Sequence, residues 1–117
     1  MRLLLTRDEV NPDKPDIHGR TPLWGASSKG HEGVVRLLLA RDDVNPDKPD
    51  NDGQTPLWGA SKNGREGVVI LLLARGHVNP DRPNNRGQTP LGIASERGYS
   101  NILALLQPRT TPISSTD

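Results

Sequence analysis

Apolar residues fall into short runs along the chain, and the polar residues that flank these runs suit helix ends. Thr21 is a good helix N-cap, and Pro22 suits the first helical position because its missing N–H would have no partner there. Gly30 can adopt the left-handed conformation that often ends a helix. A second helix with an aliphatic face is expected to open at Glu32 and to end by Asp42. The pattern therefore predicts a short helix of small residues followed by a more apolar one.

The same pattern recurs at a fixed spacing of 34 residues. The run T-P-L-W-G-A-S at 21–27 returns at 55–61, and a weaker copy stands at 89–95. Residues 16–49 and 50–83 differ at 10 of 34 positions, so 24 positions are identical. A fixed period in this range indicates stacked supersecondary units. We therefore expect a solenoid of helix pairs.

The expected organisation is one repeat domain followed by a tail. The predicted units are a repeat domain over 1–107, made of a half repeat 1–15, repeats 16–49 and 50–83 and a divergent repeat 84–107, and a flexible polar tail 108–117. The half repeat would leave Leu3, Leu4 and Leu5 partly uncovered. Either the chain is a fragment of a longer array, or another molecule covers that face.

Composition limits the classes of function. Hydrophobic residues make up 32% of the 117 residues and Phe is absent, which favours a thin core in which each layer touches only its neighbours. A net charge of +1 is too balanced for a protein whose affinity comes mainly from phosphate contacts, so no nucleic-acid partner is expected. No segment approaches the length of a membrane span. We therefore expect an intracellular, cytoplasmic protein that does not bind a membrane.

Candidate catalytic and metal-binding residues are sparse. His18, His31 and His77 fall on different parts of the predicted units and do not converge, and the chain has no Cys, so no metal site is expected. The sequence contains no nucleophile–base–acid set, no paired carboxylates and no Gly-rich phosphate loop. It therefore predicts neither catalysis nor a cofactor.

These residues resemble the ankyrin repeat family. The family run T-P-L-H-x-A-A stands here as residues 55–61, and the family run that begins G-H and ends L-L-L stands as residues 30–39. The resemblance covers residues 1 to about 107. It implies an all-α solenoid of stacked helix-turn-helix units with projecting β-hairpin or loop fingers, and it implies binding of partner proteins.

The chain departs from the family pattern at one position of each unit. The usual His after T-P-L is replaced by Trp24, Trp58 and Gly92. In the family, that His is taken to hydrogen-bond to loop backbone. The two Trp side chains would either pack between repeats or stand exposed in the groove as anchors for a partner.

The resemblance also implies which residues bind a partner, namely those on the finger tips and on the first helices. Carried over by position, they are Ile17, His18, Arg20, Ser28, Lys29, Asn51, Asp52, Gln54, Lys62, Asn63, Asn85, Arg86, Gln88, Glu96 and Arg97, with Trp24 and Trp58 added if their rings are exposed. Five of the 10 positions that differ between 16–49 and 50–83 belong to this set. The internal comparison of the repeats therefore supports the same surface.

Two functions stay open at this point. The first is a recognition module that binds a heterologous protein through the fingers and the concave face of the first helices. The second is self-association, in which copies form a homo-oligomer through Leu3, Leu4 and Leu5. Neither reading identifies a particular partner, because a fold names no target.

Overall fold

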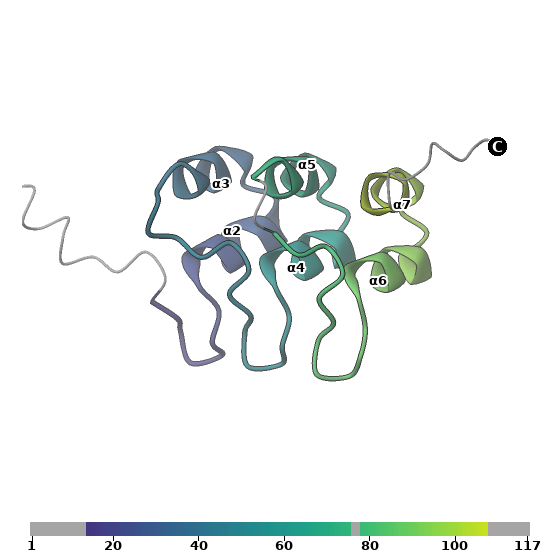
Figure 1. Cartoon of the computed structure of the whole chain (residues 1–117), viewed down its shortest axis with the longest axis horizontal. Coiled ribbons are helices and arrows are strands. Elements are labelled where there is room, and N and C mark those ends of the chain that lie inside the picture. Colours follow the sequence, from purple (N-terminus) through teal and green to yellow (C-terminus); the bar gives the residue numbers. More distant parts are fainter. Residues whose placement is uncertain (1–13, 76–77, 108–117) are drawn as a thin grey trace, which may run out of the picture.

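The helices of the chain form two rows in a computed structural model that describes residues 14–75 and 78–107 (Figure 1). The first helices of the three units are α2, α4 and α6, and the second helices are α3, α5 and α7. Their bounds are α2 Pro22–Lys29, α3 Glu32–Leu39, α4 Pro56–Lys62, α5 Glu66–Ala74, α6 Pro90–Arg97 and α7 Ser100–Leu106. No strand occurs within the two described ranges. The prediction of an all-α repeat solenoid is confirmed.

Each first helix begins at the kind of residue that the sequence singled out as an N-cap. The Thr21 hydroxyl accepts a hydrogen bond from the Trp24 backbone N–H at 3.2 Å, and Pro22 occupies the first turn. Gly30 ends α2 with a φ of 78°, a left-handed conformation that suits glycine. Equivalent caps start α4 at Thr55 and α6 at Thr89. Local signals therefore set the start of each first helix, and left-handed glycines end α2 and α6, whereas α4 ends at Asn63 with a φ of -98°.

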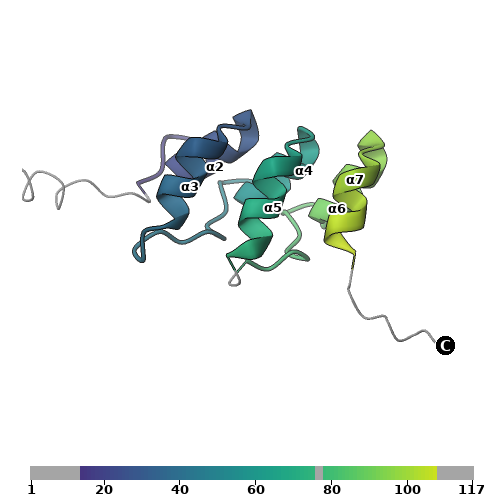
Figure 2. The ribbon, with the colours of Figure 1, turned by 90° about the horizontal axis from the view of Figure 1, so that it is seen from above.

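The core is a set of contacts between neighbouring units. The first helices pack in the order α2, α4, α6, and the second helices in the order α3, α5, α7 (Figure 2). Each first helix also packs on the second helix of its own unit. The largest fully buried aliphatic side chains are Leu23, Leu57, Leu72, Ile102, Val35, Val68 and Val69. No unit holds a complete core of its own, so burial depends on the stack.

The second helices differ in burial although their sequences are nearly identical. Val34 on α3 is 46% exposed, whereas Val68, its counterpart 34 residues later on α5, is fully buried. Leu37 is 72% exposed. The reason is position in the stack, because α5 lies between α3 and α7, whereas no other described helix covers the far side of α3. The aliphatic face expected for the first full unit is therefore only partly buried.

Three loops precede the first helices and project together to one side (Figure 1). Each loop turns on an Asp or Asn side chain: an Asp16 carboxylate oxygen accepts from the backbone N–H groups of His18 and Arg20 at 2.8 and 3.0 Å. Asp50 and Asn84 accept equivalent pairs in the next two loops. The predicted fingers are therefore short turns rather than regular β-hairpins, and we call them fingers below.

Some predicted features lie outside the described residues. These are Leu3, Leu4 and Leu5, the half repeat 1–15 apart from Lys14 and Pro15, and the tail 108–117. The boundaries of the predicted units stay predictions.

The burial of Leu72 predicts the effect of truncating it. Leu72 has no exposed surface and belongs to the cluster that α5 shares with its neighbours. We expect Leu72→Ala to lower the free energy of unfolding by about 2–5 kcal/mol, because it leaves a cavity in the central unit. Urea denaturation followed by circular dichroism measures this change. A loss well below about 1 kcal/mol would show that the core does not depend on the central unit.

Candidate functional site

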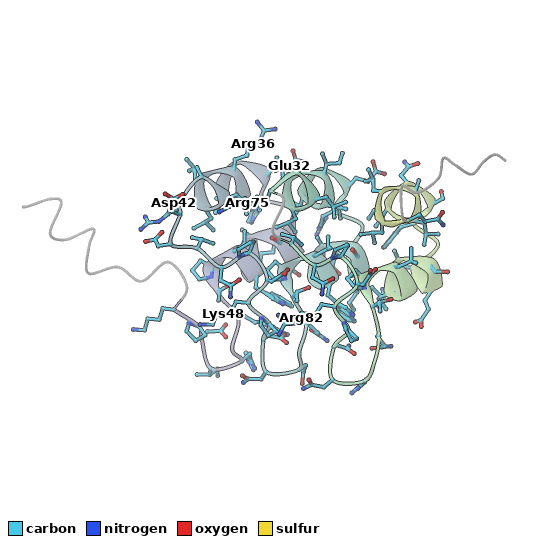
Figure 3. All side chains as sticks on the ribbon, viewed as in Figure 1. Glu32, Arg36, Asp42, Lys48, Arg75 and Arg82 are labelled. Carbon is cyan, nitrogen blue, oxygen red and sulfur yellow. The ribbon has the colours of Figure 1, made fainter. Side chains whose placement is uncertain are left out.

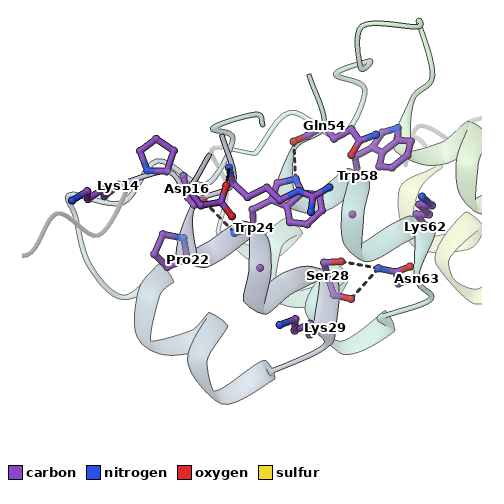
Figure 4. Close-up of a pocket in the computed structure, with 15 residues that line it drawn as sticks. Lys14, Asp16, Pro22, Trp24, Ser28, Lys29, Gln54, Trp58, Lys62 and Asn63 are labelled. Atoms are coloured by element: carbon purple, nitrogen blue, oxygen red, sulfur yellow. Dashed lines mark hydrogen bonds between the residues drawn. The ribbon is translucent and has the colours of Figure 1, made fainter. Parts of the chain in front are cut away.

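A cavity of about 680 Å³ opens between the first helices of the first two described units, beside the first finger (Figure 4). Two glycines, Gly25 on α2 and Gly59 on α4, lie in its wall, together with parts of Trp24 and Trp58. The other residues that line it are Lys14, Pro15, Asp16, Arg20, Thr21, Pro22, Ser28, Lys29, Gln54, Lys62 and Asn63. The size falls within the range typical of ligand pockets.

The two Trp side chains lie between units and connect each first helix to the finger that follows. The Trp24 indole N–H donates to the Gln54 backbone oxygen at 2.8 Å, and the Trp58 indole N–H donates to the Gln88 backbone oxygen at 3.1 Å. Trp24 is 8% exposed and Trp58 is 3% exposed. The indole thus supplies a bond to loop backbone, and only an edge of each ring is left for the cavity.

The two glycines in the cavity wall differ in the space beside them. A Cβ atom built at Gly59 would lie 3.4 Å from the Trp24 ring and 3.6 Å from the Ser28 Cβ. Gly25 is its counterpart in the preceding unit, and a Cβ there would meet nothing within 4 Å. A Cβ at Gly59 would therefore already be in van der Waals contact with the neighbouring unit, which leaves no room for a longer side chain, whereas Gly25 faces open space.

Arg20 is held in place on the cavity wall. Its guanidinium carbon lies 4.4 Å from the centre of the Trp24 ring, and its Nε lies 3.6 Å from a carboxylate oxygen of Asp50. The Asp50 side chain is 1% exposed, while the Arg20 side chain is 40% exposed. A cation over an aromatic face and a buried counter-ion both favour one orientation of the guanidinium.

Basic side chains outnumber acidic ones in the rest of the lining. Lys14 and Lys29 border the cavity, and the Lys62 ammonium lies 5.6 Å from the centre of the Trp58 ring. Among the described residues that line the cavity, Asp16 is the only acidic one. Hydrogen bonds from the backbone N–H groups of Arg20 and His18 lower the pKa of Asp16 below its ordinary value of 3.8, so it is ionised at neutral pH.

Ser28 and Asn63 bond to each other across the two units (Figure 4). The Asn63 side-chain amide donates to the Ser28 hydroxyl at 2.7 Å and to the Ser28 backbone oxygen at 3.0 Å. The Arg65 Nε donates to the same backbone oxygen at 3.0 Å. These two candidate residues therefore stabilise the stack as well as line the cavity.

The structure divides the remaining candidate residues into two further groups. The first lies at the finger tips and is exposed, and it comprises Ile17, His18, Asn51, Asp52, Asn85 and Arg86. The second belongs to the third unit, outside the cavity lining, and comprises Gln88, Glu96 and Arg97. Gln88 accepts a side-chain hydrogen bond from Asn84 at 3.0 Å. Fingers, cavity and third unit together form the candidate binding surface.

Sequence reasoning missed several cavity residues because they lie outside the variable positions that were carried over from the family resemblance. Lys14, Pro15, Asp16, Thr21 and Pro22 line the cavity, yet the same residue types recur 34 positions later. These residues face the cavity because they belong to the first described finger and helix. Position in the stack, which a comparison of repeats does not contain, places them in the cavity wall.

Within residues 14–75 and 78–107, no group of three or more His, Cys, Asp or Glu side chains is arranged to hold a metal ion. No helix in this described part of the chain is long and apolar enough to cross a membrane.

Two family models match the chain. Residues 43–117 match a model described as ankyrin repeats in three copies, and residues 18–51 match a model of the single ankyrin repeat. No curated protein matches the chain.

Gly25 and Gly59 give a matched test of how closely the units pack. We expect Gly59→Leu to destabilise the fold by about 1–3 kcal/mol, because the new side chain must enter space that the Trp24 ring and Ser28 occupy. Gly25→Leu extends into open space, so removal of a helical glycine should raise stability by up to about 1 kcal/mol. Urea denaturation of both variants measures the difference. Equal effects of the two substitutions would contradict the inter-unit packing.

The pKa of Asp16 predicts how the first finger responds to acid. Because the folded-state pKa lies below 3.8, ionised Asp16 stabilises the turn at neutral pH, and this contribution is lost as the pH falls through the folded-state pKa. An NMR titration of the Asp16 carboxyl carbon should give a midpoint below 3.8. Asp16→Asn is the control, since Asn84 accepts the same pair of bonds in the third finger. A midpoint at or above the ordinary value would refute these hydrogen bonds.

Proposed function

The chain belongs to the ankyrin repeat family, whose repeats are generally protein–protein interaction modules, and on that premise we propose that it binds a partner protein through its fingers and first helices. The partner would contact the exposed finger tips and the wall formed by α2, α4 and α6. The observation that carries this proposal is the rigid alignment of the fingers.

Neighbouring fingers are joined by hydrogen bonds along their tips. The Asn51 backbone N–H donates to the His18 oxygen at 2.9 Å, and the Asn85 backbone N–H donates to the Asp52 oxygen at 2.9 Å. The side-chain amide of Asn51 also donates to the Ile17 oxygen at 3.2 Å. Side chains on these tips are therefore presented in a fixed row. A surface ordered before binding loses less conformational entropy when a partner docks.

The residue types at the tips support recognition rather than packing. Asp16, Asp50 and Asn84 hold the three turns through the same bonds. The exposed positions beside them differ in charge: His18, Asp52 and Arg86 occupy equivalent places. Asp or Asn residues with the same role thus build the scaffold, and residues of differing charge face solvent where a partner can contact them.

Self-association is the second candidate function. The sequence places it at Leu3, Leu4 and Leu5, which lie outside the described residues, and one observation on the described residues also favours it. Val34 and Leu37 leave an exposed aliphatic face on α3, at the end of the described stack. However, a copy stacked head to tail would bring α6 against α2, and Gly92 has no indole to donate to the next finger. Such a contact would lack the bond that Trp24 and Trp58 provide. We therefore place partner binding first.

The remaining expectations from the sequence stay predictions. We propose that the chain works inside the cell, has no catalytic activity, uses no cofactor and does not bind nucleic acid.

The proposed function is tested by affinity capture with a finger-tip variant. We expect the native chain to retain a partner protein from cell lysate, and His18→Ala with Asp52→Ala and Arg86→Ala to weaken that binding roughly tenfold or more. Arg36→Ala is the matched control, because Arg36 points outward from α3, away from the fingers (Figure 3). Unchanged capture by the triple variant would contradict binding through the finger tips.

Light scattering on the purified chain distinguishes the second candidate. If the chain is a monomer and still captures its partner, self-association is ruled out as its function. A stable oligomer that Leu37→Glu dissociates would support it, because that substitution places a charge on the exposed face of α3.

A further inference from the structure

Resting on the proposed function, we propose that the cavity beside Trp24 and Trp58 binds an acidic segment of the partner protein, with a carboxylate seated among Arg20, Lys29 and Lys62. The proposal names the chemistry of the segment and the place where it docks. It adds to finger-tip recognition a second contact of defined charge.

Charge is concentrated at this cavity although the chain as a whole is almost balanced. The 117 residues carry a formal net charge of +1. The described residues that line the cavity include the basic Lys14, Arg20, Lys29 and Lys62 and the acidic Asp16, and the buried Asp50 carboxylate lies 3.6 Å from the Arg20 Nε, so four basic groups face two acidic ones. A cleft lined by one sign of charge focuses its field on an incoming ligand of opposite sign. An acidic segment is therefore favoured there over a neutral or basic one.

Arg20 provides a guanidinium whose position is set before a ligand arrives. Its Nε has no exposed surface and faces Asp50, so the 40% exposure of the side chain comes from its other atoms. The guanidinium also lies over the face of the Trp24 ring, with its carbon 4.4 Å from the ring centre. Guanidinium groups bind carboxylates in a planar, often bidentate geometry, and a fixed orientation loses less entropy on binding.

The same geometry argues against a single-stranded nucleic acid as the occupant. Binding of unpaired bases relies on exposed aromatic faces on which the bases stack. Trp24 and Trp58 are 8% and 3% exposed, and basic side chains already lie over both rings. The indoles therefore offer an apolar edge for an aliphatic side chain next to the acidic one, and no free face for a base.

The probe is a short synthetic peptide that alternates Glu with Leu and Pro, carries no aromatic residue and has a fluorescent label for anisotropy. The control peptide has the same sequence with every Glu replaced by Gln. Both Trp residues of the chain line the cavity, so the intrinsic Trp emission reports occupancy directly. A labelled oligothymidylate tests the nucleic-acid alternative.

The cavity variants copy residues that other units carry at the same positions, and circular dichroism of each variant checks that the fold is retained. They are Arg20→Gln, Lys29→Asn and Lys62→Ser, after Gln54, Asn63 and Ser28. Arg36→Gln removes a charge on α3, outside the cavity lining, and is the control for each single variant. Gly25→Leu is a steric variant, since its side chain extends from the cavity wall into open space.

We expect the acidic peptide to bind with a change in Trp emission. The variant that combines Arg20→Gln, Lys29→Asn and Lys62→Ser should weaken this binding roughly tenfold or more. We expect Arg36→Gln to leave binding unchanged and Gly25→Leu to abolish it. The proposal would be overturned if the Gln peptide bound as tightly as the acidic one, or if the combined cavity variant bound the acidic peptide as tightly as the native chain. Tighter binding of the oligothymidylate than of the acidic peptide would also overturn it. If the acidic peptide fails while the finger-tip variant still loses its captured partner, this inference falls and the proposed function stands.

Discussion

The hydrogen bond from each Trp indole to the finger of the following unit is the interaction on which the rest of the structure depends. Trp24 and Trp58 each join a first helix to the next finger, at 2.8 and 3.1 Å. The helix that carries the indole and the finger that accepts from it therefore cannot move independently. Because the fingers are also bonded to one another, the orientation of the first helices fixes the orientation of the candidate surface.

The position of the Trp24 ring also explains where the cavity lies. The Trp24 ring packs beside Gly59 on α4, and the Arg20 guanidinium lies over the same ring. The buried Asp50 carboxylate, which also holds the second finger, faces the Arg20 Nε. Some residues that stabilise the stack therefore also position the groups that a ligand would contact. A substitution that disturbs one will disturb the other.

Local sequence signals predicted the helices well, because helix boundaries depend on neighbouring residues. Thr21 and Gly30 act where a cap and a left-handed residue were expected. Exposure depends on the stack instead: Val34 and Val68 occupy equivalent positions, yet only Val68 is buried. For the same reason Lys14 and Asp16 line the cavity although nothing in their own sequence context distinguishes them from Lys48 and Asp50. From the replacement of His by Trp alone, the rings could either pack between units or stand exposed in the groove. The fold shows that they lie between units.

The most direct test of this account is amide and indole hydrogen exchange measured by NMR on the intact chain. If each indole donates to the backbone of the following finger, the side-chain N–H protons of Trp24 and Trp58 will exchange far more slowly than those of a free indole. Their protection should also be lost together with that of the buried amides of α4. Exchange of either indole proton at the rate of a solvent-exposed Trp would contradict the account.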